Sequence, residues 1–264
     1  MALLEMTAYS ACLGGETEFY VILPENTQGM IGMDGRASAC CPTLYLLHGM
    51  SDDHSIWLRR TSIERYAAEK GLAVVMPAAG LSYYTDMAHG EKYWQFVSRE
   101  LPALCRSLFP MLSPRREDTF VAGLSMGGYG ALKCALRAPE TFSCGAGLSA
   151  VADIAETVTT VQFSTKRYWE EVFGPLDQVK GSFHDLFAAA SDYAAAGQRP
   201  QTKFYMWCGT EDFLYAQNTR LRDHMRALGL NLTYEESPGI HAWEYWDQKI
   251  QDVLNWLPLK KEEC

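Results

Sequence analysis

Short apolar runs recur along the chain, each bounded by glycine, proline or polar residues. Residues 17–25 alternate between apolar and polar positions, which predicts a strand. Continuous apolar runs, typical of strands buried on both faces, occupy residues 43–49, 72–77, 118–124, 142–149 and 202–209, and residues 231–237 form a further predicted strand. The glycine-rich stretch 25–42 predicts a hairpin loop after the first of these strands.

Helical periodicity fills most of the intervals between the predicted strands. The predicted helices span residues 56–69, 91–109, 126–138, 214–228 and 241–257, with a kink expected near Pro102. Alternating strands and helices predict an α/β fold, with a mostly parallel central sheet flanked by helices on both faces. We expect one domain, residues 1–264. Residues 151–200 exceed a simple crossover and predict a small cap-like insertion, with an ordinary surface insertion as the alternative.

Composition narrows the class of protein further. The chain has 264 residues, 48% hydrophobic and 21% charged, which suits one globular domain with a large core. Its net charge of −9 and lack of a basic patch argue against nucleic-acid binding. No apolar run is long enough to span a bilayer. The N-terminal segment lacks a basic region and carries Glu5, so it does not resemble a signal peptide, and we expect a cytoplasmic protein.

The eight cysteines show no C-x-x-C spacing, which argues against a zinc ribbon or a thioredoxin-type redox motif. Several lie in apolar runs, where cysteine behaves as a small hydrophobic residue. We therefore expect reduced, structural thiols at Cys12, Cys40, Cys41, Cys105, Cys134, Cys144, Cys208 and Cys264. No metal and no cofactor is predicted.

Residues 123–127, "GLSMG", form a G-x-S-x-G motif between a predicted strand and a predicted helix. In that context the motif predicts a tight, strained turn that lifts the hydroxyl of Ser125 clear of the sheet. Side chains at Gly123 and Gly127 would collide with the neighbouring strand and helix. The helix also directs unsatisfied N–H groups at the site, which favours developing negative charge. We predict Ser125 as a nucleophile; a merely flexible turn is the alternative.

A serine nucleophile needs a base, and in this type of fold the chain order is serine, then acid, then histidine. Three histidines follow Ser125. His224 lies on a charged helical face and is interpreted as solvated, whereas His184 lies in the predicted insertion. His241 directly follows a predicted strand and precedes the last helix, so it is the predicted base.

The acid is expected after a strand that lies between the nucleophile and the base. Asp212 follows the predicted strand 202–209 and is the preferred candidate. Glu211 beside it and Asp153 after the preceding strand are alternatives. A helix begins soon after Asp212, so a helix-capping role for this residue also remains open.

An oxyanion hole needs two backbone donors. One is expected from Met126, which follows the nucleophile, and the other from the loop after an early strand. In "LLHGMSDD" Gly49 allows the chain to turn, so the N–H of Met50 is the second predicted donor. We expect His48 to support this loop and include it among the candidate substrate-binding residues.

Five blocks of the sequence together resemble the esterase D group of α/β-hydrolases, and within it the bacterial tributyrin esterases. They are "LLHGMSDDHSIW", "YWQFVSRELPAL", "GLSMGGYGALKCALRAPETF", "CGTEDFL" and "GIHAWEYWDQKI". The resemblance runs from about Thr17 to Leu257 and implies an α/β-hydrolase fold. It also implies Ser125, Asp212 and His241 as the triad, and the Met50 and Met126 amides as the oxyanion hole.

The resemblance leaves the substrate open, because the group includes feruloyl esterases, S-formylglutathione hydrolases and mycolyltransferases. S-formylglutathione hydrolases usually carry a cysteine where this chain has Asp52, which disfavours that activity. We expect a serine carboxylesterase acting on short acyl esters, acetyl to butyryl, including acetylated sugars. Feruloyl ester hydrolysis, S-formylglutathione hydrolysis and acyl transfer are the alternatives.

Aromatic residues near the site-forming blocks are candidates for an apolar acyl pocket. The candidate substrate contacts are Trp57, Tyr93, Trp169 and Trp243, whereas Trp94 and Trp246 are expected in the core. The expected partner is a small-molecule ester, and the sequence does not decide whether the chain forms a homo-oligomer. A dinucleotide site at "GAGLSA", residues 145–150, is disfavoured, because no clear helix follows the motif.

Overall fold

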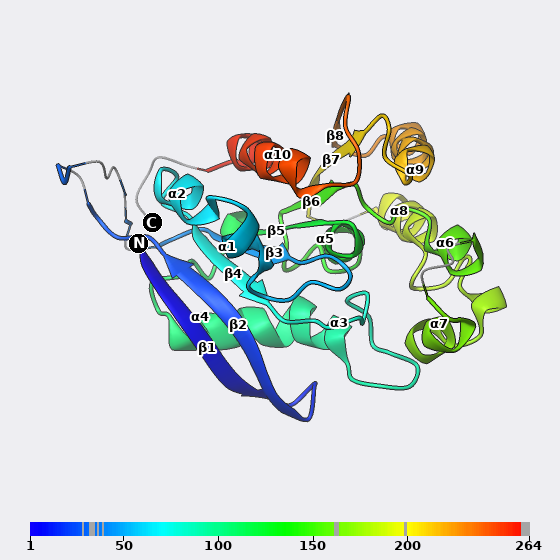
Figure 1. The fold of residues 1–264 in the computed structure, drawn as a ribbon, viewed down its shortest axis with the longest axis horizontal. Coiled ribbons are helices and arrows are strands. Elements are labelled where there is room, and N and C mark those ends of the chain that lie inside the picture. The colour runs from blue at the N-terminus through cyan, green and yellow to red at the C-terminus, as the bar shows by residue number, and fades with distance from the viewer. Residues whose placement is uncertain are drawn as a thin grey trace.

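The computed structural model describes residues 1–27, 29–31, 35, 37–38, 40–160, 164–197 and 200–259. One eight-stranded sheet crosses this part of the chain in the order β1-β2-β4-β3-β5-β6-β7-β8 (Figure 1). The strands are β1 (Ala2–Ser10), β2 (Gly15–Leu23), β3 (Thr43–Leu47), β4 (Ala73–Pro77), β5 (Thr119–Leu124), β6 (Cys144–Leu148), β7 (Lys203–Gly209) and β8 (Leu232–Ser237). The six strands β4, β3, β5, β6, β7 and β8 are all parallel to one another, which confirms the predicted fold class.

The first strand of the sheet was not predicted from the sequence. β1 lies at the edge of the sheet, and its residues alternate between half-buried and exposed. Leu3 and Tyr9 occupy exposed positions of this strand, which weakens its contrast between apolar and polar positions. β1 pairs antiparallel with β2, with Ala2 opposite Leu23 and Ser10 opposite Gly15.

The prediction that residues 25–42 form a hairpin loop is wrong for the residues that the structure describes. The hairpin instead joins β1 to β2 through the tight turn between Ser10 and Gly15, where Gly14 has a φ of 65°. β2 pairs antiparallel with β4 and not with β3, so residues 25–42 cross from β2 to a strand farther into the sheet. Several residues of that connection lie outside the described part of the chain.

Helices cover both faces of the sheet (Figure 1). They are α1 (Ile56–Arg60), α2 (Ile63–Ala68), α3 (Tyr93–Gln95), α4 (Leu101–Leu108), α5 (Met126–Arg137), α6 (Ile154–Thr160), α7 (Lys166–Phe173), α8 (Leu186–Ala195), α9 (Tyr215–Ala227) and α10 (Trp243–Trp256). Short 3₁₀ turns occur at η2 (Arg116–Asp118) and η3 (Leu176–Gln178). The predicted helix 56–69 divides in two because the Thr61 hydroxyl donates to the Trp57 carbonyl and accepts the Ile63 N–H.

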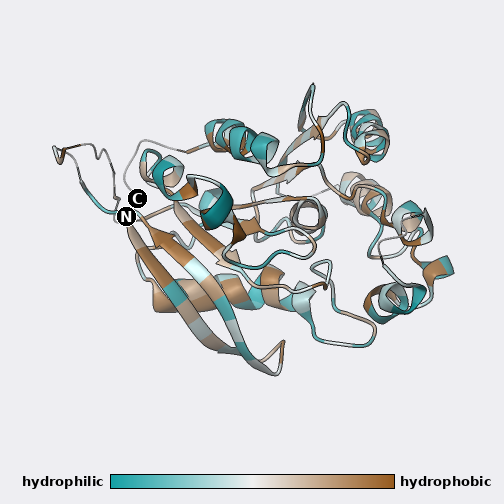
Figure 2. Cartoon of the chain, viewed as in Figure 1, coloured by the Kyte–Doolittle hydropathy of each residue, from teal (hydrophilic) through white to brown (hydrophobic). Residues whose placement is uncertain are grey.

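The two faces of the sheet belong to two apolar clusters. Tyr45 and Val121 point to the face covered by α4, α5, α8 and α9, whereas Leu44 and Phe120 point to the face covered by α1, α2 and α10. Because successive strand residues point to opposite faces, a strand buried on both sides needs an unbroken apolar run. Figure 2 shows this pattern, with hydrophobic strands and hydrophilic residues along α9 and α10.

The expected disturbance near Pro102 is a π-helical turn, η1 (Phe96–Glu100), between α3 and α4. The N–H of Leu101 donates to the Phe96 carbonyl, five residues back. Proline removes one helical donor and crowds the carbonyl four residues earlier, and a wider turn relieves that crowding. The long predicted helix therefore continues through Pro102 with a local change of geometry.

Residues 151–200, between β6 and β7, contribute α6, α7, η3 and α8 in the part that the structure describes. α7 is fastened to the loop after β4, because the N–H groups of Ala88 and His89 donate to the carbonyls of Val172 and Glu171 at 3.0 and 2.9 Å. Trp169 of α7 is buried and packs edge-on against Tyr83, with 5.3 Å between ring centroids. The excursion therefore packs on the body of the protein.

The prediction of reduced cysteines is confirmed at six positions and wrong at one. Cys12, Cys41, Cys105, Cys134, Cys144 and Cys208 are free. Cys40, which lies in the loop before β3 rather than within an apolar run, is disulfide-bonded. Burial raises the pKa of Cys105 and Cys134 to about 12, so these thiols stay protonated and behave as apolar core groups. Cys264 lies outside the described residues.

Candidate active site

Ser125 lies at the turn between β5 and α5 in a strained backbone conformation. Its φ is 52° and its ψ is −115°, a region that residues other than glycine rarely adopt. The Ser125 N–H donates to the Leu148 carbonyl at 2.9 Å, and the Ser125 carbonyl accepts from the N–H groups of Tyr129 and Val151 at 3.0 and 3.2 Å. These bonds to β6, α5 and the segment after β6 hold the turn rigid.

The two glycines of the motif are required by close backbone approach. A Cβ placed on Gly123 would lie 2.4 Å from the carbonyl oxygen of Gly127. A Cβ placed on Gly127 would lie 2.4 Å from the carbonyl oxygen of Leu47, in β3. Both distances are far below van der Waals contact, and neither obstacle is a flexible side chain. The interpretation as a merely flexible turn is therefore wrong.

His241 and Asp212 complete a chain of hydrogen bonds with Ser125. The His241 Nε2 lies 3.0 Å from the Ser125 Oγ, and the His241 Nδ1 lies 2.9 Å from the Asp212 Oδ2. Since a carboxylate only accepts, Nδ1 carries the proton and Nε2 is free to accept one from the serine hydroxyl. The Asp212 side chain is fully buried, and its Oδ1 accepts the Leu214 N–H at 2.9 Å.

The two alternative acids have other partners. The Glu211 Oε2 accepts the Gly239 N–H at 2.5 Å, and this bond lowers the pKa of Glu211. Asp153 forms an ion pair with Arg220, with 3.0 Å between Oδ2 and Nη2. The structure thus brings Asp212, and neither rival, to the imidazole of His241.

The other two histidines after Ser125 are engaged elsewhere. The His184 Nδ1 lies 2.8 Å from the Thr85 hydroxyl, and burial lowers the pKa of this imidazole to about 3. The His224 Nε2 lies 3.0 Å from both the Ser191 hydroxyl and the Phe187 carbonyl. His224 is therefore held against α8, which corrects the expectation of a solvated side chain.

His48 supports the loop after β3 from within the core. It is 1% exposed, its Nδ1 donates to the Gly49 carbonyl at 2.7 Å, and its Nε2 accepts the Ala79 N–H at 3.0 Å. Burial lowers the pKa of His48, so the imidazole stays neutral, as the Ala79 bond requires. Both ring nitrogens are occupied, which supports the loop-supporting role and rules out the candidate role in substrate contact.

The loop that carries Met50 lies directly against the Ser125 turn. A Cβ placed on Gly49 would lie 3.8 Å from the Cβ of Ser125. Met50 is half-buried, and the hydroxyl of Tyr83 lies 3.8 Å from its sulfur. On the other side, Met126 is the first residue of α5, whose first N–H groups have no acceptor within the helix.

Two consecutive tyrosines near this loop were not predicted from the sequence. Tyr83 and Tyr84 are buried and have positive φ values of 52° and 49°. The Tyr84 hydroxyl donates to the His48 carbonyl at 2.8 Å. The sequence offers one signal: both tyrosines follow the carboxyl end of β4. In a parallel sheet this end lies at the same edge as the end of β5, where Ser125 stands.

The candidate aromatic contacts divide into buried and partly exposed residues. Trp57 and Trp169 are 0% and 1% exposed, so the expectation that they contact substrate is wrong. The Trp57 indole N–H donates to the Leu47 carbonyl at 3.0 Å, beneath the site. Trp243 is half-buried, stacked edge-on against Trp57, and Tyr93 is half-buried at the start of α3. Trp94 and Trp246 lie in the core, as predicted.

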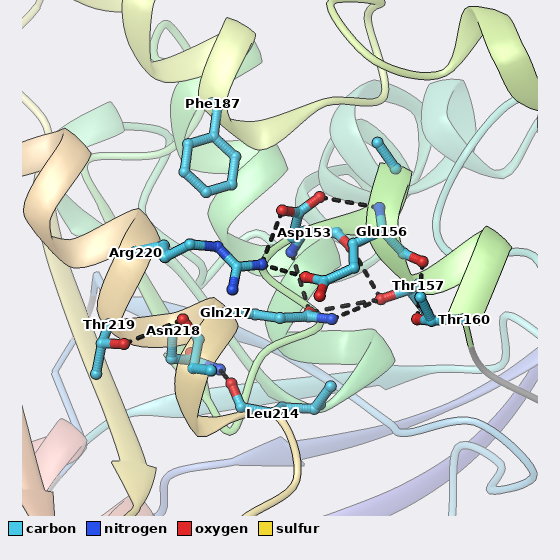
Figure 3. A network of polar contacts seen from close by, with 12 residues as sticks. Asp153, Glu156, Thr157, Thr160, Phe187, Leu214, Gln217, Asn218, Thr219 and Arg220 are labelled. Carbon is cyan, nitrogen blue, oxygen red and sulfur yellow. Dashed lines mark hydrogen bonds and ion pairs between the residues drawn. The ribbon is translucent and has the colours of Figure 1, made fainter.

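A cleft of about 570 Å³, lined mostly by charged residues, lies between α6, α8 and α9, outside the Ser125–His241–Asp212 chain. Arg220 pairs there with Asp153 and Glu156 (Figure 3), and Phe187 also lines the cleft. The Gln217 amide ties α9 to α6 through the Asp153 N–H and the Thr157 hydroxyl. The charged lining is predominantly acidic, with Asp153, Glu156, Asp177 and Asp185 against Lys180 and Arg220.

Among the described residues, no group of three or more histidine, cysteine, aspartate or glutamate side chains is placed to hold a metal ion. No helix in the same residues is long and apolar enough to cross a bilayer. "GAGLSA" begins inside β6, where Gly145 and Gly147 pack against α5, so its glycines are not part of a phosphate-binding turn.

Comparison with known proteins places this chain in a family. Residues 10–257 match the family of esterases described as "Putative esterase". The chain belongs to this esterase family. An acetyl esterase from Caldicellulosiruptor saccharolyticus is 32% identical over 265 residues, which cover 97% of this chain and 98% of the relative.

Two solved structures from Staphylococcus aureus are each 36% identical to this chain. Each match covers 97% of this chain and 98% of the chain in the solved structure. One is FphF, a fluorophosphonate-binding serine hydrolase with substrate bound, at a TM-score of 0.86. The other is an S-formylglutathione hydrolase, FrmB, at a TM-score of 0.84. The fold is that of the α/β-hydrolases, and the resemblance to the esterase D group is confirmed at the level of the family.

Proposed function

We propose that this protein is a serine carboxylesterase with Ser125 as nucleophile, His241 as base and Asp212 as acid. The observation that carries the proposal is the continuous hydrogen-bond chain from the Asp212 carboxylate through His241 to a serine held in a strained turn. A serine hydroxyl becomes a useful nucleophile only with such a base, oriented in turn by a third group.

The proposed reaction has two halves that pass through an acyl-enzyme. The Ser125 Oγ attacks the ester carbonyl carbon while the His241 Nε2 takes the hydroxyl proton. The carbon–oxygen bond to the alcohol then breaks, and the imidazolium returns that proton to the departing oxygen. Water repeats the sequence, giving a carboxylic acid and free Ser125. Asp212 keeps the proton on Nδ1 and stabilises the imidazolium. These steps require no metal or cofactor.

The oxyanion formed in each half is proposed to bind the N–H groups of Met50 and Met126. The Ser125 N–H is already bonded to the Leu148 carbonyl, so it is not a free donor. Met126 supplies the next amide along the chain, at the N-terminus of α5, where the helix dipole favours negative charge. The loop carrying Met50 lies against Ser125 and is held by His48. Losing one such donor costs about 10²–10³ in kcat in other hydrolases.

Short acyl groups, acetyl to butyryl, are the proposed substrates. The relative named acetyl esterase supports this choice, since it is 32% identical over nearly the whole chain. The resemblance to tributyrin esterases supports the upper end of the range. Hydrolysis of a thioester such as S-formylglutathione is the second candidate, because a 36% identical structure bears that name. Asp52, in place of the usual cysteine, favours the oxygen ester. Feruloyl ester hydrolysis and acyl transfer would both proceed through the same acyl-enzyme and are tested alongside.

A panel of esters with a nucleophile variant tests the proposal. Wild-type enzyme is expected to hydrolyse p-nitrophenyl acetate and butyrate faster than the long-chain esters, and Ser125→Ala is expected to lose at least about 10³-fold in kcat/KM. Ser62→Ala, a serine before α2, is the matched control. Undiminished hydrolysis by Ser125→Ala would refute the nucleophile. A preference for S-formylglutathione or methyl ferulate would replace the substrate class, and ester products formed with added alcohols would indicate acyl transfer.

A further inference from the structure

Two large apolar side chains beside the proposed catalytic residues are exposed. Phe213 directly follows Asp212 and is 62% exposed. Ile240 directly precedes His241 and is 51% exposed. Among the described residues few large hydrophobic side chains are this open, and these two lie on the two loops that meet at the imidazole. Single exposed apolar residues are ordinary on protein surfaces, so the weight here lies on the position of these two beside the imidazole.

The rings around the imidazole show which side of it remains open. Phe213 lies 4.6 Å from His241 between ring centroids, at 51°, and Trp246 lies 4.8 Å away at 86°. Trp246 is 4% exposed, and its indole N–H donates to the Ser149 hydroxyl at 3.1 Å. Trp246 therefore closes the core side of the imidazole, whereas Phe213 contacts the imidazole and keeps most of its surface in solvent.

The chemistry of the proposed reaction fixes which part of an ester meets this surface. The imidazolium must donate to the departing alcohol oxygen across about 2.6–3.2 Å. The carbon atoms attached to that oxygen then lie within reach of groups that pack on the imidazole. Phe213 packs on it, and Ile240 adjoins it in the chain. The acyl carbon instead lies over Ser125 and the loop of Met50.

We propose that Phe213 and Ile240 form an apolar contact surface for the alcohol part of the substrate. This inference rests on the esterase function proposed above. It assigns the alcohol to the aryl or alkyl class rather than to sugars or charged alcohols. The charged cleft at Asp153 and Arg220 (Figure 3) carries the hydrogen-bonding groups that a sugar or charged alcohol would need. Among the described residues, the rings that pack on the imidazole are Phe213 and Trp246, and neither lines that cleft.

The test varies the alcohol while the acyl group stays acetyl. The substrates are 2-naphthyl, cyclohexyl, ethyl and glucose-1-yl acetate, and the variants are Phe213→Ala, Phe213→Leu and Ile240→Ser. All of these esters form the same acetyl-enzyme, so kcat/KM reports the step in which the alcohol is present. Phe213→Ala is expected to lower kcat/KM for the naphthyl and cyclohexyl esters about tenfold more than for ethyl acetate. Phe213→Leu is expected to restore most of that loss, and Ile240→Ser to shift the same ratio in the same direction.

The outcomes separate the inference from the esterase function itself. An equal loss for all four alcohols would overturn the inference, because Phe213 would then act only by positioning the imidazole. A preference of the wild-type enzyme for glucose-1-yl acetate, unaffected by Phe213→Ala, would also overturn it. Failure of the esterase function is recognised independently, by Ser125→Ala retaining activity on every ester. The matched control is Leu108→Ala, which alters an exposed apolar residue on α4. It is expected to leave kcat/KM for all four esters unchanged relative to wild type.

Discussion

Glu211 and Gly239 are joined by hydrogen bonds in both directions. The Gly239 N–H donates to the Glu211 Oε2 at 2.5 Å, and the Glu211 N–H donates to the Gly239 carbonyl at 3.0 Å. A Cβ on Gly209 would lie 2.2 Å from that same carbonyl. The loop bearing Asp212 and the loop bearing His241 are thus fastened to each other two residues before the imidazole.

Removing the Glu211 carboxylate is expected to slow the reaction without removing any group that touches substrate. We predict that Glu211→Ala lowers kcat/KM for p-nitrophenyl acetate about 10- to 100-fold, because misplacing a catalytic group by about 1 Å costs this much. Glu211→Gln keeps an acceptor oxygen and is expected to recover most of the rate. Steady-state kinetics of both variants, with Glu64→Gln on the exposed face of α2 as control, provide the measurement. Equal loss in the alanine and glutamine variants would contradict a role based on this hydrogen bond.

The pH dependence of that contact has a definite sign. The bond from Gly239 lowers the pKa of Glu211 below its usual value. A carboxyl group with a depressed folded-state pKa stabilises the fold above its unfolded pKa and loses that contribution as pH falls through the folded pKa. The difference in free energy of unfolding between wild type and Glu211→Gln is therefore expected to shrink on the acidic side. Denaturant unfolding of both proteins from pH 7 down to pH 4 tests this trend.

Gly127→Ala is expected to disrupt the Ser125 turn and not merely to stiffen it. The new methyl group would lie 2.4 Å from the Leu47 carbonyl oxygen, so β3 and α5 would have to separate. We predict a loss of stability of roughly 2–4 kcal/mol together with loss of activity, since overpacking against backbone has little room to relax. Thermal unfolding measures the change. Gly181→Ala, at a turn with open space around it but a φ of 76°, serves as the comparison and is expected to cost less.

The part of the site that was predictable depends on backbone-level signals. β5 and β7 are buried on both faces, so their apolar runs are unbroken, and the glycines around Ser125 mark the turn directly. Chain order at the ends of strands pointed to His241 as the base, whereas it left Glu211 and Asp153 open beside Asp212, which only the folded structure brings to the imidazole. β1 was missed because its solvent-facing positions include apolar residues such as Leu3. Trp57 was misassigned because proximity in sequence to a site-forming loop does not reveal which way a side chain points.

Contacts between loops that are far apart in the sequence could not be predicted either, because the sequence does not reveal where side chains point in the folded protein. The link from Glu211 to Gly239 spans 28 residues, and only the folded loops bring its two ends together. Phe213 could be located beside Asp212, but neither its exposure nor its contact with His241 can be read from its position in the chain. Such side-chain relations follow from tertiary packing and not from periodicity.

Lys133 is a fully buried lysine without a carboxylate partner among the described residues, and its replacement is expected to stabilise the protein. Its Nζ donates to the Thr85 hydroxyl at 2.8 Å and lies 5.3 Å from the ring centroid of Trp94. Burial lowers the pKa of Lys133 to about 7. We predict that Lys133→Met raises the free energy of unfolding by roughly 1–4 kcal/mol at pH 7, because an apolar group of similar length avoids the desolvation of an amine.

The stability of the wild-type protein should also vary with pH because of this lysine. Its folded pKa lies below its unfolded value, so between pH 7 and about 10 the unfolded state binds more protons and the Lys133 contribution improves as pH rises. Denaturant unfolding of wild type and Lys133→Met at pH 7, 8 and 9 measures the difference between them. That difference is expected to narrow with rising pH, and a constant difference would contradict a neutral buried amine.

His48 is expected to affect the rate through the loop that carries Met50. Replacing it with phenylalanine fills the same space but leaves the Ala79 N–H and the Gly49 carbonyl without their partner. We predict that His48→Phe lowers kcat about 10- to 100-fold with a smaller change in KM, because an oxyanion donor acts mainly in the transition state. His54→Phe is the control, because the His54 imidazole packs edge-on against Tyr20 of β2.

His48 is also expected to make the stability of the protein depend on pH. Since burial lowers the pKa of His48, its contribution to the free energy of unfolding should fall as pH drops below about 6.5, where the unfolded state takes up the proton first. Unfolding curves at pH 7.5 and 5.5 should therefore differ more for wild type than for His48→Phe.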